Sequence, residues 1–493
     1  MLLLITALTI VLYALLTIPS YLRLRRFPGP PLAQISHLYL FLVALSSRAY
    51  KIHMRTRRLY GPGLIRIAPD TLITDDPTII RRINAPHSGY TKGPWYSVMR
   101  LDPYRHTMVS SPDAAFHDDI KARVAPGYSG REVPSMEGDV DSVLMELKGL
   151  MERKYVDDGE SGLRVMDWGV VAQWFTLDVL TRVVYGREFG YLAREEDVFG
   201  YVGAMEDMGI FFALCSDVPA LGRILLSRPV LRLLGPKVGD KRGFGVLMRM
   251  AKEVVAERFE QGKLDKPDML GSFIRRGLPQ RQCEVELLAQ LVAGSDTTAN
   301  VFRVALHLAI STPRVYNRLQ QEIDDAVAAG QISRPVTAAE GKKLAYLRAF
   351  LDECLRFTPP VSLLFPRVVP PKGDTLDGKF VPGGTNIATD FWSMGRRVDI
   401  FGEDACVFRP ERFLEASPEK KSRMEKTTDM FFGNGRYMCT GKTLAWMEMN
   451  KLFIELLRDY DFQMIDPETP YTRSHRALFV IRNMKMRVAR RNV

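Results

Sequence analysis

The residues with the clearest chemical potential lie in one glycine-rich stretch, 431–441, which reads Phe-Phe-Gly-Asn-Gly-Arg-Tyr-Met-Cys-Thr-Gly. Glycine tolerates left-handed backbone and lets the chain approach a ligand closely. Cys439 lies directly before a helical pattern, where backbone N–H groups favour a thiolate. A thiolate in an apolar loop is a good soft ligand for a transition metal. Taken alone, the loop fits equally well a buried cysteine that packs as a small hydrophobic side chain.

A second polar group interrupts a long apolar tract, residues 285–311, which lacks proline and is typical of a buried central helix. Gly294 costs a helix interior about 1 kcal/mol relative to alanine. Asp296 is costly in apolar surroundings unless it is hydrogen-bonded. The hydroxyl of Thr297 can bond back to a helix carbonyl and locally open the helix. The pattern indicates either a small groove with an acid and a hydroxyl, or a polar kink in a core helix.

A third pattern is an acid and a base three residues apart, Glu353 and Arg356, on a helix expected over 345–357. This spacing places both charges on one helix face. An exposed pair of this kind would contribute little to stability. The segment 408–413, Phe-Arg-Pro-Glu-Arg-Phe, follows further along the chain.

Together these stretches resemble the cytochrome P450 family. The loop resembles the family's haem-binding loop, Phe-Gly-x-Gly-x-Arg-x-Cys-x-Gly, and the central tract resembles its Ala-Gly-x-Asp-Thr-Thr motif at every position. The positions that match in the loop are Phe432, Gly433, Gly435, Cys439 and Gly441. One position departs, because the family arginine falls at Tyr437 and this chain carries Arg436 one residue earlier.

The resemblance implies a haem b cofactor, with Cys439 as the axial ligand of its iron. The cofactor-binding residues that it implies in the loop are Phe432, Gly433, Gly435, Arg436 and Gly441. Arg367 falls where the family places a propionate-binding arginine. His117 and Lys121 share one face of a helix expected over 113–124, capped near Ser110 or Ser111. They match the family's propionate-contacting helix, although a solvated charged face remains the alternative.

The resemblance also implies roles for the acid, the alcohol and the charged pair. Dioxygen chemistry on haem needs two protons while bulk water stays out. Thr297 would hold dioxygen and ordered water, and Asp296 would relay protons inward. Glu353 and Arg356 would interlock with Arg412 and fix the loop that bears Cys439, which is a structural role.

Composition limits the other classes of protein. The 493 residues fit one large enzyme domain or two to three smaller ones, and a hydrophobic fraction of 46% fits a large core. The five cysteines are scattered and form no CxxC pair, so neither a disulfide framework nor a zinc ribbon is indicated. The net charge of +11 suits anionic lipid or an acidic protein partner, whereas no motif supports nucleic acid.

The N-terminus predicts a membrane anchor. Residues 1–22 are almost wholly apolar and long enough to span a bilayer, with no preceding Lys or Arg and three arginines directly after. This charge pattern predicts that the rest of the chain lies in the cytosol, and the resemblance implies the endoplasmic reticulum membrane. A cleaved signal peptide would need a basic start and a small-residue cleavage site, and neither is present. We expect a proline-rich hinge over 23–35 and a catalytic domain over 36–493.

The remaining pattern predicts a mainly α protein with a small β region, and by resemblance the cytochrome P450 fold, with haem between the central long helix and the helix after Cys439. Short strands are expected at 63–68 and 71–74. Residues 87–112 would form an irregular segment over the haem. Residues 217–237, rich in leucine and proline, would either dip into the membrane or pack into the core.

Three further segments surround the expected site. Residues 361–365 are predicted to form a strand facing the substrate, and the loop around 473–476 would close the pocket. Residues 419–426 are predicted to be a solvated loop on the cysteine side, where an acidic electron donor docks.

The resulting hypothesis is a membrane-bound haem-thiolate monooxygenase of the fungal type that tailors secondary metabolites, acting on an apolar small molecule with O2. No flavin or nicotinamide fingerprint is present, so electrons would come from NADPH–cytochrome P450 reductase, with cytochrome b5 as a second donor. The alternatives are a haem-thiolate isomerase or dehydratase that needs no reductase, and a non-catalytic haem sensor. Neither would need the acid and alcohol of the central tract.

Overall fold

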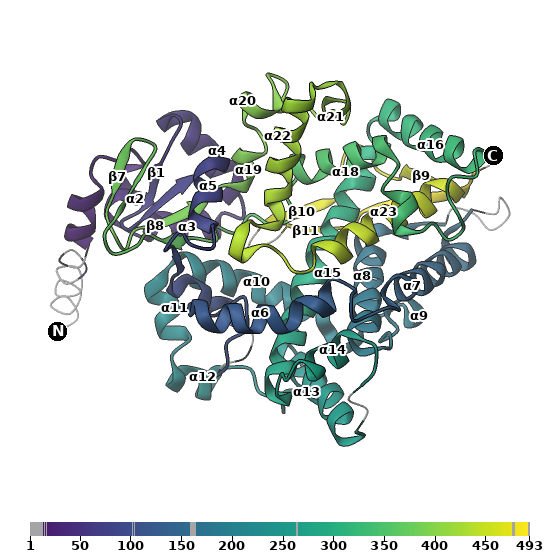
Figure 1. Ribbon diagram of the computed structural model, residues 1–493, viewed down its shortest axis with the longest axis horizontal. Helices are drawn as coiled ribbons and strands as arrows, with labels where there is room; N and C mark the ends of the chain where they lie inside the picture. Colours follow the sequence, from purple (N-terminus) through teal and green to yellow (C-terminus); the bar gives the residue numbers. More distant parts are fainter. Residues whose placement is uncertain are drawn as a thin grey trace.

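The structure, a computed structural model, describes residues 13, 15, 17–100, 102, 104–157, 164–262, 265–475 and 479–491. In this part of the chain helices dominate, and the strands form small sheets, the largest at the N-terminal side of the molecule (Figure 1). The predicted fold class, mainly α with a small β region, is confirmed.

The α-helices of the first half precede the long central helix. They are α2 (Pro31–Ile35), α3 (Leu38–Leu45), α4 (Ala49–Tyr60), α5 (Pro77–Asn84), α6 (Ala114–Tyr128), α7 (Met136–Leu150), α8 (Trp168–Tyr185), α9 (Tyr191–Arg194), α10 (Tyr201–Asp217), α11 (Pro219–Leu225), α12 (Arg228–Leu234), α13 (Phe244–Glu260) and α14 (Met269–Arg275). Short helical turns are η1 (Pro94–Met99), η2 (Met151–Tyr155) and η3 (Val198–Gly200).

The second half begins with the central helix and ends with the helix after the cysteine loop. Its helices are α15 (Gln280–Ile310), α16 (Pro313–Ala328), α17 (Ala338–Gly341), α18 (Ala345–Phe357), α19 (Phe391–Met394), α20 (Val398–Phe401), α21 (Arg412–Glu415), α22 (Pro418–Thr428) and α23 (Lys442–Asp459). The turns η4 (Asp429–Phe432) and η5 (Gly435–Tyr437) lie directly before α23.

The largest sheet joins distant parts of the sequence. Its strands, in spatial order, are β1 (Ile65–Ala68), β2 (Thr71–Thr74), β8 (Asn386–Thr389), β5 (Arg367–Val368) and β3 (Thr91–Lys92). Only β2 and β8 run parallel. The smaller sheets pair β6 (Asp374–Leu376) with β7 (Lys379–Val381), β10 (Thr472–His475) with β11 (Phe479–Arg482), and β12 (Lys485–Arg490) with β4 (Met166–Asp167) and β9 (Tyr460–Met464).

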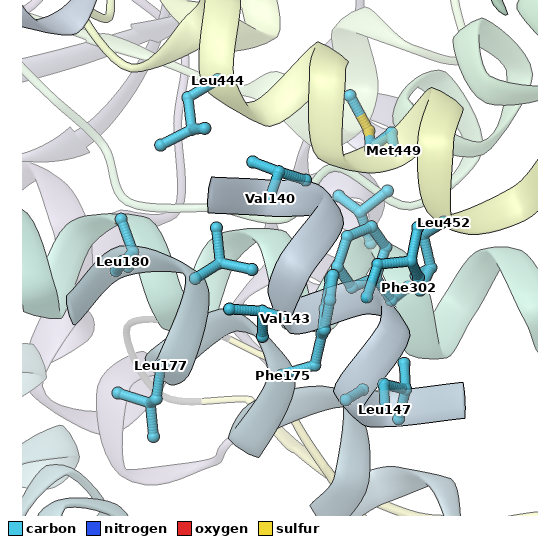
Figure 2. Close-up of a cluster of buried hydrophobic side chains, with 14 of the residues drawn as sticks. Val140, Val143, Leu147, Phe175, Leu177, Leu180, Phe302, Leu444, Met449 and Leu452 are labelled. Atoms are coloured by element: carbon cyan, nitrogen blue, oxygen red, sulfur yellow. The ribbon is translucent and has the colours of Figure 1, made fainter. Parts of the chain in front are cut away.

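The helical core forms around α15. Side chains of α7, α8, α15 and α23 converge there, and Figure 2 shows Val143, Phe175, Phe302 and Met449 among them. The ring centroid of Phe302 lies 5.9 Å from that of Phe175 and 6.2 Å from that of Phe453. Each fully buried aliphatic or aromatic side chain contributes about 1.5–3 kcal/mol, so this cluster holds α15 rigidly beneath the rest of the fold.

Several local expectations are wrong. Residues 419–426 form most of α22, because Ser417 caps the helix and Met424 is buried beneath it. Residues 361–366 lie outside any strand, and β5 begins only at 367, because Pro366 has no N–H to pair. The cap of α6 is Asp113, whose carboxylate accepts from the N–H groups two and three residues later, rather than a serine.

The ends of the chain close the description. The predicted anchor over 1–22 lies largely outside the described residues, and within those described we find no helix with the length and hydropathy needed to cross a bilayer. The hinge segment packs on the sheet, with Leu24 and Phe27 buried and the N–H of Arg66 donating to Pro28 O at 2.7 Å. Residues 217–237 form α11 and α12, in which Leu231 is buried.

Candidate active site

The cysteine loop owes its shape to two glycines. Gly433 and Gly435 have φ values of 78° and 58°, which residues with a Cβ rarely adopt. A Cβ on Gly435 would also lie 2.3 Å from Asn84 O. The loop closes when the N–H of Cys439 donates to Phe432 O at 2.7 Å, which places the thiol at the start of α23.

The Cys439 thiol keeps exposed surface although it lies deep among protein atoms. Burial raises its pKa, and the N–H groups of Gly441 and Lys442, with the ammonium groups of Lys121 and Lys442, lower it. A Cβ on Gly441 would lie 3.8 Å from the sulfur. The sulfur is therefore accessible and surrounded by groups that favour a thiolate, and a metal cation bonded to it would complete its ionisation.

The predicted acid and alcohol lie in the middle of α15, which is continuous from Gln280 to Ile310. Thr297 Oγ1 donates to Ala293 O at 2.8 Å, so the hydroxyl bonds back without opening the helix. A Cβ on Gly294 would lie 3.0 Å from Leu180, which explains the glycine. Ala293 is exposed in the middle of this helix and Thr297 is partly exposed, so neighbouring side chains do not fully cover either residue.

The carboxyl of Asp296 lies among buried polar groups. It accepts a hydrogen bond from Tyr201 of α10 at 3.2 Å. Burial raises the pKa of Asp296 to about 6, while the charge of Arg303 and the side chains of Tyr201 and Gln173 lower it. The acid is therefore partly protonated near neutral pH.

The α6 helix is bound to the cysteine loop. The ammonium of Lys121 donates to Arg436 O at 2.6 Å and to Met438 O at 3.2 Å. The guanidinium of Arg436 lies 3.4 Å from Asp118. His117 is buried, and the centroid of its ring lies 4.9 Å from the ring centroid of Tyr437. Burial and the charge of Lys92 lower the pKa of His117 to about 4. His117 is therefore neutral at pH 7 and can offer a hydrogen bond rather than a charge.

Arg367 is buried, and no carboxylate among the described residues pairs with it. Its guanidinium donates to Asn84 Oδ1 at 2.8 Å and to the Tyr96 hydroxyl, and lies 4.1 Å from the ring centroid of Tyr437. Burial lowers the pKa of Arg367 to about 10. Leaving a guanidinium in such surroundings without an anion is costly.

Lys92, which the sequence reasoning missed, is the cross-strand partner of Arg367 in the β3–β5 pair. Its ammonium donates to Met108 O at 2.9 Å and Val109 O at 2.8 Å. Burial and the charge of Arg367 lower its pKa to about 7. Like charges directly opposite each other destabilise a sheet, so an anion bound beside this pair would relieve their repulsion and favour the charged form of Lys92. Only the strand register, which the sequence does not display, reveals this pair.

Glu353, Arg356 and Arg412 meet in the interior behind the loop. The guanidinium of Arg356 binds both carboxylate oxygens of Glu353, at 2.5 and 2.7 Å, and the Nε of Arg412 lies 3.1 and 3.2 Å from the same oxygens. All three side chains are at most 3% exposed. Arg412 also donates to Asp404 Oδ1 at 2.7 Å, which supplies a second negative charge.

This charged cluster reaches the cysteine loop through Gly395. Arg356 donates to Gly395 O at 2.6 Å. A Cβ on Gly395 would lie 3.3 Å from the ring of Phe431, the residue before Phe432. The Glu353 cluster therefore supports the segment on which Cys439 is held.

A groove of about 730 Å³ lies beside the cysteine loop, between it and α22. Its lining residues are Arg81, Glu419, Ser422, Arg423, Lys426, Asp429, Gly433, Asn434, Met438 and Lys442. Four of them are basic and two acidic. Of the residues that the sequence singled out at 419–426, four line this groove from α22, namely Glu419, Ser422, Arg423 and Lys426.

These features fit a haem. Cys439 would bind the iron, and the buried side chains of Arg367 and Lys92 would pair with the propionates. A single soft thiolate is a ligand that suits haem iron.

Comparison with known proteins identifies the family. Residues 137–489 match the family model of cytochrome P450. The chain is 42% identical to cytochrome P450 monooxygenase ABA1 of Pyricularia oryzae, covering 96% of this chain and 93% of the relative. It is 41% identical to cytochrome P450 monooxygenase aba1 of Botryotinia fuckeliana, covering 94% and 92%. The chain therefore belongs to the cytochrome P450 family of haem b monooxygenases, which use O2 and a redox partner.

Proposed function

We propose that this chain is a haem-thiolate monooxygenase that takes electrons from NADPH–cytochrome P450 reductase. It inserts one atom of O2 into an apolar small molecule by hydroxylation, epoxidation or oxidative ring chemistry. The observation that carries the proposal is the accessible Cys439 thiol together with the Asp296–Thr297 pair on a buried helix. Haem bound through Cys439 would supply oxygen activation, because a thiolate pushes electron density to iron and favours O–O cleavage.

The protein's own residues would deliver protons, exclude bulk water and hold the haem in position. Asp296, with a pKa of about 6, gives a proton and regains it near neutral pH. The Thr297 hydroxyl, one turn from exposed Ala293, orients the water through which that proton moves. The apolar side chains of α15 would exclude bulk water, and Lys92 and Arg367 would bind the two propionates.

Thr297→Ala tests the oxygen chemistry. We expect hydrogen peroxide released per NADPH consumed to rise, and product per NADPH to fall by at least about tenfold, because a positioned proton donor contributes 10²–10⁴-fold. The measurement is peroxide and NADPH in a reductase-coupled assay. Thr298→Ala is the matched control, since Thr298 is buried and next in sequence. Unchanged peroxide release in Thr297→Ala would favour an isomerase, a dehydratase or a haem sensor.

Lys92→Met tests the propionate site. Loss of one charge-assisted hydrogen bond, worth about 1.5–3 kcal/mol, is expected to speed transfer of haem to apomyoglobin by at least about tenfold. Lys154→Met removes an exposed lysine that pairs with Glu195 and should leave the rate unchanged. Equal rates in both variants would exclude a role for Lys92 in holding haem.

The electron donor would dock on the groove beside α22. The basic side chains Arg81, Arg423, Lys426 and Lys442 surround that groove next to the cysteine loop. An acidic face of the reductase, or of cytochrome b5, complements them, and such contacts steer association rather than add affinity. We expect electron transfer through this surface to weaken as salt rises.

The chain would act at the endoplasmic reticulum membrane. Residues 1–22 form its single-pass anchor, 23–35 its hinge, and 36–493 the cytosolic catalytic domain. The exposed apolar side chains Ile224, Leu233 and Leu234 of α11 and α12 support a second contact with lipid. The relatives named above are monooxygenases of fungi, and a place in fungal secondary metabolism is part of this proposal.

A further inference from the structure

A tyrosine from another helix holds the acid of α15. The hydroxyl of Tyr201 lies 2.7 Å from Ser295 Oγ and donates to Asp296 Oδ2 at 3.2 Å. Ser295 Oγ also lies 2.8 Å from Leu291 O. Each hydroxyl carries one proton, so Tyr201 donates to Asp296 when Ser295 directs its own proton to Tyr201 rather than to Leu291 O. Tyr201 is fully buried and is the first residue of α10.

The chain places Tyr201 by means of an unusual backbone. Phe199 and Gly200, directly before it, both have left-handed φ values, 62° and 64°. A bulky residue in this region is a genuine outlier that costs about 1–3 kcal/mol. Phe199 is 43% exposed, and its ring centroid lies 5.5 Å from that of Phe189. This left-handed turn directly precedes the tyrosine that reaches Asp296.

The remaining neighbours of Asp296 come from α8 and α15. Arg303 is buried and donates to Gly169 O at 2.9 Å and to Gln173 Oε1 at 3.0 Å. Its charge and the Gln173 amide both favour the ionised carboxyl. Burial lowers the pKa of Arg303, and the charges of Asp296 and Asp167 oppose this effect, which leaves the pKa at about 10. Arg303 is therefore charged at neutral pH.

We propose that Tyr201 is a positioning residue for Asp296, holding its carboxyl between α8, α10 and α15 in the orientation from which it delivers protons. The inference rests on the proposed function, because it assumes that Asp296 is the proton donor. The tyrosine hydroxyl stabilises the ionised carboxyl and therefore lowers the pKa of Asp296. Without that hydroxyl, the acid keeps its proton to a higher pH and turns more freely.

Tyr201→Phe removes the hydroxyl and keeps the ring. A hydrogen bond to a charged group changes the pKa of that group by about one unit. We therefore expect the pKa of Asp296 to rise by about one unit. The pH at which reductase-driven NADPH consumption falls on the alkaline side should rise equally. Peroxide released per NADPH should rise several-fold. A second readout needs no turnover: the infrared band of the protonated carboxyl, identified by its absence in Asp296→Asn, should titrate about one pH unit higher.

Tyr191→Phe is the matched control, since Tyr191 is equally buried and its hydroxyl has no hydrogen-bond partner in the described part of the chain. It should leave both pH curves in place. Ser295→Ala removes the hydroxyl that contacts Tyr201 and leaves Tyr201 itself unchanged. It should shift both pH curves in the same direction as Tyr201→Phe. If Tyr201→Phe fails to bind haem, the Ser295→Ala curves test the inference in its place.

Two results would overturn the inference. One excludes only the role of Tyr201, and the other also excludes Asp296 as the proton donor. If Tyr201→Phe and Ser295→Ala match wild type while Asp296→Asn alters the pH curve, proton delivery by Asp296 stands and the role of Tyr201 is wrong. If Asp296→Asn also leaves the curve unchanged, the proposed proton donor is wrong and the positioning role falls with it.

Discussion

The dithionite-reduced protein is expected to show a strongly red-shifted Soret band with carbon monoxide, and Cys439→His is expected to abolish it. The imidazole would replace an anionic sulfur by a neutral nitrogen, which removes the electron donation that favours O–O cleavage. Monooxygenase activity should fall by more than about a hundredfold, since loss of even an outer-shell partner of a metal ligand costs 10–100-fold. The measurement is the carbon monoxide difference spectrum beside the reductase-coupled rate.

Cys406→Ser is the control for the loss of a cysteine as such. Cys406 is exposed and, like Cys439, forms no disulfide. This variant should keep the red-shifted band and the rate. A folded wild-type protein that shows the same unshifted band as Cys439→His would mean that Cys439 does not bind iron, and the mechanism proposed above would fail with it.

The long elements could be predicted because their patterns are strong. The helix expected over 345–357 is α18 to the residue, since Thr358-Pro359-Pro360 leaves it no way to continue. The strands at 65–68 and 71–74 follow from β-branched residues around a Pro-Asp turn. The order of the motifs along the chain was sufficient to place the cysteine loop, the central helix and the charged cluster in one family.

The residues that complete the site could not be predicted, because they act through contacts between distant segments. Lys92 becomes significant only through its register with Arg367, 275 positions later in the sequence. Tyr201 reaches Asp296 from α10, 95 positions earlier in the sequence. His117 reads as a cation in the sequence, whereas burial beside Lys92 makes it neutral. Each outcome depends on desolvation and neighbouring charge, which no local pattern contains.

Glu353→Gln is expected to destabilise the protein by about 3–5 kcal/mol, because removing one partner of a buried ion pair leaves uncompensated charge. The glutamine keeps the size of the side chain, so the loss measures charge rather than packing. Two guanidinium groups are affected, those of Arg356 and Arg412, and of these only Arg412 keeps a carboxylate, that of Asp404. With total stabilities of about 5–15 kcal/mol, such a loss is readily measured by urea unfolding.

Glu257→Gln separates burial from charge. Glu257 pairs with Arg187 on the surface, where both side chains are about half exposed, and its loss should cost no more than about 1 kcal/mol. The Glu353 variant should also lose haem faster, since Arg356 reaches the cysteine loop through Gly395 and Phe431. Equal destabilisation by both substitutions would show that the interior cluster is not what holds the loop, and the support of Cys439 would then have to come from α6 through Lys121.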